Sequence, residues 1–201
     1  MAVNNHSGTD ILWNSFLDGD DKAFGAVYYA FINALLTYGK KLTTDRELIH
    51  DAVQEIFMDL YQKRIKKHIP IGNLKGYLFI SLKNAILKKI LQNRVYDDNV
   101  TDDHQNEFTI EYSFQDQLIS REISEEKHQR LQKAIVALSA KQKEIIYLRF
   151  EEELEYTEIA RLMKITVESA RKQLYRALLS LRQTLDNESF LILFSVLGKN
   201  H

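Results

Sequence analysis

Apolar residues recur at helical spacing through most of this 201-residue chain, and this periodicity limits its fold more than any other feature. The chain has only seven glycines and one proline among its 201 residues. Both numbers are well below average usage, which is about 7% for glycine and about 5% for proline. Turn-rich β folds are therefore disfavoured. One helical stripe consists of Phe24, Val27, Tyr28, Phe31, Leu35 and Leu36. The sequence predicts an all-α protein.

Two helical modules and a linker are predicted from where this periodicity stops and resumes. The first module spans residues 10–94, with a loop at Pro70 and Gly72. Residues 95–126 lack a sustained apolar period and are read as a linker. The second module spans residues 127–185. An apolar tail follows at 186–201; we expect it to pack on the second module's core, and a surface for a partner is the alternative.

Charge is segregated along the chain although the net charge is only −1. Residues 62–94 hold nine basic side chains and no acidic one, whereas residues 95–126 hold ten acidic and one basic. A charge run usually marks a solvated helix face. Nine positive charges in 33 residues, with no acidic residue among them, favour contact with a polyanion.

The second module contains the pattern of a helix-turn-helix. Residues 155–163 form a short helix, residues 164–166 a turn, and residues 167–181 a second helix capped by Thr166. Its predicted buried stripe is Val167, Ala170, Leu174, Leu178 and Leu181. The other side carries the predicted DNA contacts Ser169, Arg171, Lys172, Gln173, Tyr175 and Arg176. An ordinary helical hairpin is the alternative.

An acidic row lies on a helix of the first module, which we expect to begin with a capping box at Thr44 and Glu47. The row consists of Asp51, Gln54, Glu55 and Asp59, opposite the predicted buried face. Acidic side chains repel nucleic acid and suit a protein partner with basic residues. A solvated acidic face is the alternative.

The next predicted helix presents a polar face in the basic segment. Its members are Tyr77, Ser81, Asn84 and Lys88, with Lys75 nearby. An aromatic ring can stack on an unstacked base, an amide can read a base edge, and lysines can hold phosphate. The face therefore suits single-stranded nucleic acid, unless Tyr77 is mostly a core residue.

Several classes of function are disfavoured by what the sequence lacks. Without cysteine there is no disulfide, thiolate metal site or cysteine nucleophile. No phosphate-binding glycine loop or nucleophile elbow is present, and the six histidines are scattered. The longest apolar run, 190–197, is too short to span a bilayer, and no signal segment opens the chain. We expect a cytoplasmic protein that is no enzyme, holds no metal or cofactor, takes no small-molecule substrate and does not insert stably into membranes.

Three segments of the second module carry a resemblance to a known family. Residues 138–150 (LSAKQKEIIYLRF), 158–160 (EIA) and 174–178 (LYRAL) resemble region 4 of bacterial sigma-70 factors. The resemblance implies recognition of the minus-thirty-five promoter element. Three departures from the family pattern, Glu155, Lys172 and Gln173, concern the base preference.

The first module resembles region 2 of the same family. Residues 51–57 (DAVQEIF) are similar to region 2.2, which implies binding to the clamp helices of RNA polymerase. Residues 73–85 (NLKGYLFISLKNA) resemble regions 2.3 and 2.4, which engage the melted minus-ten element. Together the modules resemble the extracytoplasmic-function (ECF) group, whose expected partners are core RNA polymerase, promoter DNA and an anti-sigma factor. A conventional helix-turn-helix regulator with an N-terminal sensing domain, or an adaptor without DNA contact, are the rival interpretations.

Overall fold

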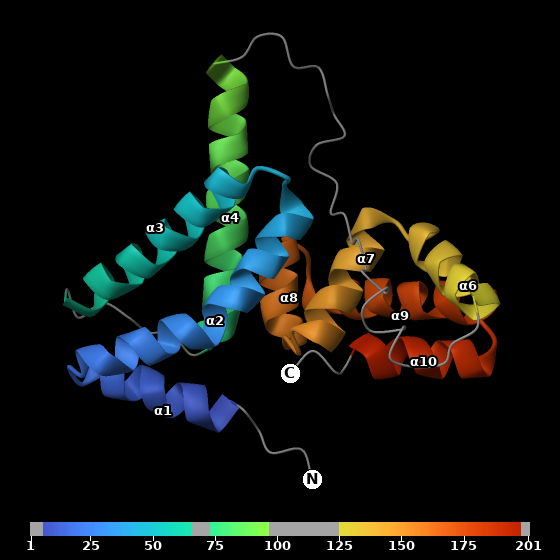
Figure 1. Ribbon diagram of the computed structural model, residues 1–201, viewed down its shortest axis with the longest axis horizontal. Coiled ribbons are helices and arrows are strands. Elements are labelled where there is room, and N and C mark those ends of the chain that lie inside the picture. The colour runs from blue at the N-terminus through green and yellow to red at the C-terminus, as the bar shows by residue number, and fades with distance from the viewer. Residues whose placement is uncertain (1–5, 66–72, 97–124, 198–201) are drawn as a thin grey trace. The chain divides into compact units, whose positions relative to one another are not determined.

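The computed structural model describes residues 6–65, 73–96 and 125–197, and within these ranges all regular secondary structure is helical (Figure 1). The chain divides into two compact units, residues 1–106 and 107–201. Most of the predicted linker, residues 97–124, lies outside the described residues. The described residues thus agree with an all-α fold of two helical units.

Unit 1 is a bundle in which the second helix packs against the other three. Its described helices are α1 (His6–Leu17), α2 (Asp21–Leu42), α3 (Arg46–Ile65) and α4 (Leu74–Tyr96). Helices α3 and α4 also pack against each other. This contact places the acidic row of α3 beside α4, most of which belongs to the basic segment.

The N-termini of two of these helices are fixed by aspartates. The Asp20 side chain accepts a hydrogen bond of 2.9 Å from the backbone N–H of Lys22 at the start of α2. At α3 the cap is Asp45, whose carboxylate accepts from the Leu48 N–H at 3.0 Å. The prediction that Thr44 caps this helix is therefore wrong. Asp and Thr both favour this position, and the sequence does not say which of two neighbours occupies it.

The core of unit 1 is aromatic and close-packed. Phe16, Tyr38 and Phe79 are fully buried, and the rings of Tyr38 and Phe79 join α2 to α4 with their centroids 5.2 Å apart. Helices α2 and α3 approach closely at Gly39, where an added Cβ would lie 2.6 Å from a methyl group of Ile49. Glycine is required here by space, because Ile49 is β-branched and cannot turn away freely.

Unit 2 is made of shorter helices. The described elements are α6 (Glu125–Val136), α7 (Ala140–Ile146), the π-helical turn η2 (Tyr147–Glu151), α8 (Tyr156–Met163), α9 (Val167–Thr184) and α10 (Asn187–Leu197). Ser139 and Gln142 form a reciprocal capping box at α7. Lys164 ends α8 in the left-handed conformation with φ of 55°. Thr166 caps α9 by accepting from the Ser169 N–H at 3.1 Å, as the sequence predicts.

Helix α10 contains residues 187–197 of the apolar tail and packs against its own unit. Leu193 is buried, and the ring centroids of Phe194 and Phe150 lie 4.7 Å apart. An ion pair of 2.6 Å between Lys127 and Glu188 joins α6 to α10. Asp186 precedes α10 and accepts from the backbone N–H of Ser189, which lowers the pKa of the Asp186 carboxyl. None of the described helices combines the length and the apolar character that a membrane crossing requires.

Candidate nucleic-acid and partner interfaces

The predicted DNA contacts of α9 form one solvent-facing surface of the helix. Five of the six are exposed, and Gln173 is half-buried. Tyr175 leaves 67% of its surface open to solvent, although it is a large aromatic residue. The opposite side is buried at Ala170, Leu174 and Leu181. Val167 and Leu178 are only half-buried, and the neighbouring Ala177 is buried in their place.

The side chains of this surface are held by local bonds. Lys172 pairs with Glu168 at 2.6 Å, one turn earlier on α9. The Thr166 hydroxyl donates to the Ser169 hydroxyl at 2.8 Å. The Arg171 guanidinium lies 5.4 Å from the ring centroid of Tyr156 on α8. This last contact spans the two helices of the motif and orients one of the predicted DNA contacts.

A second cation contacts the same Tyr156 ring. The Arg149 guanidinium lies 5.2 Å from the ring centroid and also donates to the carbonyl oxygen of Leu154 at 2.9 Å. Helix α8 begins here, and the carboxylate of Glu158 accepts from the Glu155 N–H at 2.8 Å. Glu155, a departure from the family pattern, thus stands at a well-bonded helix start.

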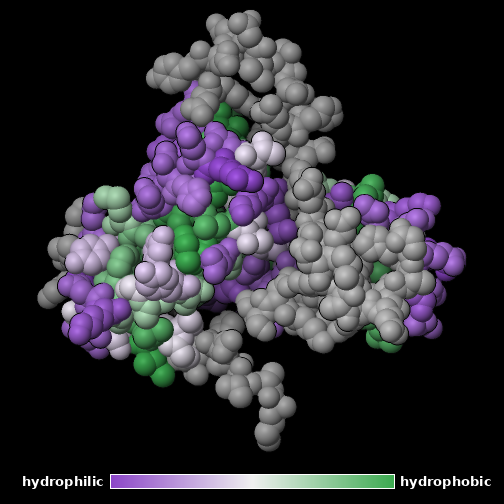
Figure 2. All heavy atoms as spheres, viewed as in Figure 1, coloured by the Kyte–Doolittle hydropathy of each residue, from purple (hydrophilic) through white to green (hydrophobic). Residues whose placement is uncertain are grey.

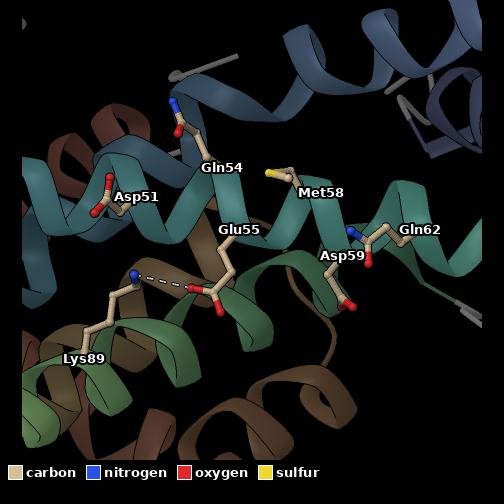
Figure 3. A pocket seen from close by; sticks show the side chains of 7 residues that line it. All are labelled: Asp51, Gln54, Glu55, Met58, Asp59, Gln62 and Lys89. Carbon is tan, nitrogen blue, oxygen red and sulfur yellow. Dashed lines mark ion pairs between the residues drawn. The ribbon is translucent and has the colours of Figure 1, made fainter.

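The acidic row of α3 lines an open groove of about 410 Å³ between α3 and α4. All four members, Asp51, Gln54, Glu55 and Asp59, are exposed. Figure 3 shows Glu55 and Asp59 pointing from α3 toward α4, whereas Gln54 points to the other side of the helix. Glu55 forms an ion pair of 3.4 Å with Lys89 of α4.

An apolar groove of about 480 Å³ lies on the other side of α3, toward α2. It is lined by Phe24, Tyr28, Gln54, Phe57, Met58, Tyr61 and Gln62. Met58 is exposed to 63% and lines both grooves, as do Gln54 and Gln62. Figure 2 shows hydrophobic side chains reaching the surface among hydrophilic ones. The exposed ridge of α3 thus has an acidic flank and an apolar flank.

The predicted single-strand contacts of α4 differ in accessibility. Asn84 and Lys88 are exposed, whereas Lys75, Tyr77 and Ser81 are half-buried. The Lys75 ammonium lies 5.9 Å from the ring centroid of Phe79, so part of this side chain covers the core. Asn84 and Lys88 are therefore the most accessible members of the face.

Tyr77 takes part in a three-residue cluster between α3 and α4. The Lys63 ammonium donates to the Tyr77 hydroxyl at 2.8 Å, and that hydroxyl donates to the Asp59 carboxylate at 3.3 Å. Lys63 and Asp59 form an ion pair of 2.6 Å. The bonds to Asp59 and then to Tyr77 raise the pKa of Lys63 above its ordinary value. Lys63 therefore stays charged throughout the physiological range.

Sequence reasoning missed three features of these surfaces. The first is the pair of bonds between α3 and α4, from Lys63 to Tyr77 and from Lys89 to Glu55. The second is the contact between Arg171 of α9 and Tyr156 of α8. The apolar groove was hidden because its aromatic residues fit a core stripe equally well. Only the Asp59–Lys63 ion pair could have been predicted from the sequence, because the two residues are four positions apart on one helix.

The comparisons with known proteins identify a family domain in unit 2 and a similar fold for both units. Residues 128–181 match the family model described as "Sigma-70, region 4". This match covers α7, η2, α8 and most of α6 and α9, including the whole predicted DNA surface. Unit 2 therefore contains a sigma-70 region 4 domain.

A solved structure extends the similarity of fold to both units. It is the co-crystal structure of the sigma factor RpoE in complex with the anti-sigma factor NepR from Bartonella quintana. The identity is 22%, the match covers 81% of this chain and 96% of that one, and the TM-score is 0.54. No curated protein sequence matches. The family match thus shows a sigma-70 region 4 domain in unit 2, and the solved structure shows that the fold of both units is similar to that of a sigma factor.

Proposed function

We propose that this chain is a sigma factor that binds core RNA polymerase through the ridge of α3 and directs it to promoters through α4 and α9. The observation that carries this proposal is the region 4 match over a helix-turn-helix whose DNA-facing side is exposed and basic. Binding and DNA opening need no catalytic group of the sigma factor itself. The chain is therefore not an enzyme.

The ridge of α3 suits a partner helix with basic and apolar residues. Its acidic flank offers Asp51, Glu55 and Asp59, and its apolar flank offers the exposed Met58 and the half-buried Tyr61. Asp51 is the most available carboxylate, because it is exposed and forms no ion pair within the described ranges. Complementary charge speeds the encounter and fixes the register, while apolar contacts supply affinity.

Helix α9 suits the major groove of the minus-thirty-five element. Arg171, Lys172 and Arg176 can donate to guanine or to phosphate, and Gln173 can pair with adenine. Ser169 and Tyr175 complete the surface. The buried side of α9 holds the helix in place, so these contacts need no refolding on binding.

Helix α4 suits the melted minus-ten element. The amide of Asn84 can read the edge of a base, and Lys75 and Lys88 can hold phosphates of the single strand. Tyr77 can stack its ring on a base but does not offer its hydroxyl to DNA, because the hydroxyl is already bonded to Lys63 and Asp59. Ser81 lies between Tyr77 and Asn84 on the same side of the helix.

A conventional helix-turn-helix regulator is not favoured, because the two-unit fold is shared with a sigma factor along most of both chains. That neighbour is bound to an anti-sigma factor, and we propose that this chain is also held by one. Polymerase and promoter DNA lie in the bacterial cytoplasm, which is where we expect the protein to act.

Run-off transcription tests the proposal. Core polymerase is mixed with the protein and with DNA fragments from upstream of the protein's own gene. We expect a discrete transcript that needs both the polymerase and this chain. A conventional regulator would instead bind duplex DNA alone as a dimer and would give no transcript with core polymerase, and that result would overturn the proposal.

A further inference from the structure

The surfaces proposed for polymerase and for single-stranded promoter DNA meet in one cluster of three side chains. Asp59 belongs to the acidic row of α3, and Tyr77 belongs to the polar face of α4. Lys63, one turn beyond Asp59, bonds to both, at 2.6 Å and 2.8 Å. The Tyr77 hydroxyl closes the triangle by donating to Asp59 at 3.3 Å.

This geometry fixes the orientation of the Tyr77 ring. A tyrosine side chain has two main torsions, so two hydrogen bonds at its tip leave the ring little freedom. Both bonds involve a charged partner, which makes each of them stronger than a bond between neutral groups.

We infer that Lys63 is a positioning residue for promoter opening: it holds the Tyr77 ring of α4 ready to stack on an unpaired base. This inference rests on the proposed function of α4. Lys63 is half-buried, with 39% of its side chain exposed, and its ammonium is engaged by Asp59 and Tyr77 rather than offered to phosphate. Its contribution therefore passes through Tyr77.

Three variants separate positioning from other roles. Lys63→Met removes the ammonium and keeps the apolar stem, Tyr77→Phe removes only the hydroxyl, and Lys63→Arg keeps a charged donor. Lys127→Met is the matched control, because Lys127 has a similar exposure of 34% and an ion pair of the same 2.6 Å, on α6. Each variant is assembled with core polymerase, and its melting temperature is measured.

The readout is the fluorescence of 2-aminopurine in a set of pre-melted promoters. Each promoter carries this base at a different minus-ten position of the non-template strand. Stacking on an aromatic ring quenches this fluorescence. We expect the wild-type holoenzyme to quench one position, and Lys63→Met and Tyr77→Phe to weaken that quench. Each should slow open-complex formation about two- to tenfold, the range of one net hydrogen bond. The double variant should be no worse than either single one, and Lys63→Arg should retain most of the quench.

Three results would overturn the inference. The first is a wild-type quench in Lys63→Met, and the second is an equally weakened quench in Lys127→Met. The third is additive defects in the double variant, which would show that Lys63 and Tyr77 act separately. Failure of the wild-type protein to form a holoenzyme is a different result, since it would overturn the proposed function itself. A lower melting temperature with an unchanged quench would assign Lys63 a structural role only.

Discussion

The two proposed promoter surfaces of this protein are built in different ways. In unit 2 the surface belongs to one helix, α9, and most of its bonds join residues within one turn, such as Lys172 and Glu168. In unit 1 the promoter surface lies on α4, and bonds across the two helices connect it to the polymerase ridge of α3, as at Tyr77 and Asp59. A surface with local bonds can be altered without disturbing its neighbours, whereas a surface bonded to another one cannot.

The largest effect should come from stripping the α9 surface. Arg171, Lys172 and Arg176 are replaced together by Ala, and each bidentate bond to a base that this removes should cost about 1–3 kcal/mol. The helix should remain folded, because its buried side is untouched and Ala favours helices. Promoter-dependent run-off transcription measures the effect on function, and circular dichroism measures the fold.

A matched triple variant isolates specific contacts from general charge. Lys133, Lys141 and Arg182 are exposed cations of unit 2 outside the proposed DNA surface, and changing all three to Ala removes the same charge. This control variant should weaken nonspecific DNA binding but keep promoter selectivity. If both triple variants transcribe equally well, α9 does not read the promoter.

The packing of unit 1 should be broken by one methyl group. Gly39→Ala places a Cβ 2.6 Å from Ile49, and such overpacking costs about 1–3 kcal/mol of unfolding free energy. Gly25→Ala on the same helix is the control, because nothing lies within 4 Å of its added Cβ. It should stabilise by roughly 0.5–1 kcal/mol. Urea unfolding measures both; equal effects would show that α2 and α3 do not approach closely at Gly39.

A smaller effect on promoter binding is expected from removing the contact that joins α8 to α9. Tyr156→Leu removes the ring beside Arg171 and should weaken minus-thirty-five binding by about 0.5–1 kcal/mol, the usual size of an exposed cation–π contact. Tyr156→Phe keeps the ring and should retain binding. Promoter affinity of the holoenzyme measures the difference. Equal binding by the Leu and Phe variants would mean that the ring does not orient Arg171.

The smallest expected change is a gain in stability. Glu153 is exposed and has a φ of 50°, a conformation that strains side chains with a Cβ. Glu153→Gly should raise the unfolding free energy by roughly 0.5–1 kcal/mol, whereas Glu153→Ala should give no such gain. Thermal melting measures both. A lower melting temperature for the Gly variant would show that Glu153 stabilises the turn through its side chain.

Sequence periodicity was sufficient where one helix carries the whole pattern. The turn at 164–166, the Thr166 cap and the exposed side of α9 follow from spacing along a single helix. The departure is at one position: the predicted stripe passes through Leu178, which is half-buried, whereas the adjacent Ala177 is completely buried.

Spacing could not show which side chains of unit 1 meet across helices. Asp59 and Tyr77 are 18 residues apart, and nothing in either segment indicates that their side chains bond. The cap at Asp45 was assigned to Thr44 because both residue types accept the same bond. The apolar groove escaped notice because Phe57 and Tyr61 repeat at helical spacing, whether they face a core or a groove.

The central claim is that α3 docks on polymerase while α4 and α9 hold DNA, and one pair of charge reversals tests it directly. Asp51→Lys with Glu55→Lys sets like charges against a basic partner, which can cost several kcal/mol. The added positive charge should leave nonspecific DNA binding unchanged or stronger. Asp10→Lys with Asp18→Lys is the control, because both side chains are exposed and lie outside the α3 ridge.

The measurement is co-purification with core polymerase beside a low-salt DNA shift for both double variants. We expect the α3 variant to change the two assays in opposite directions: holoenzyme formation is abolished while DNA retention holds or rises. The control variant should assemble holoenzyme at wild-type affinity. Wild-type holoenzyme formation by the α3 variant would contradict the assignment of α3 to polymerase binding.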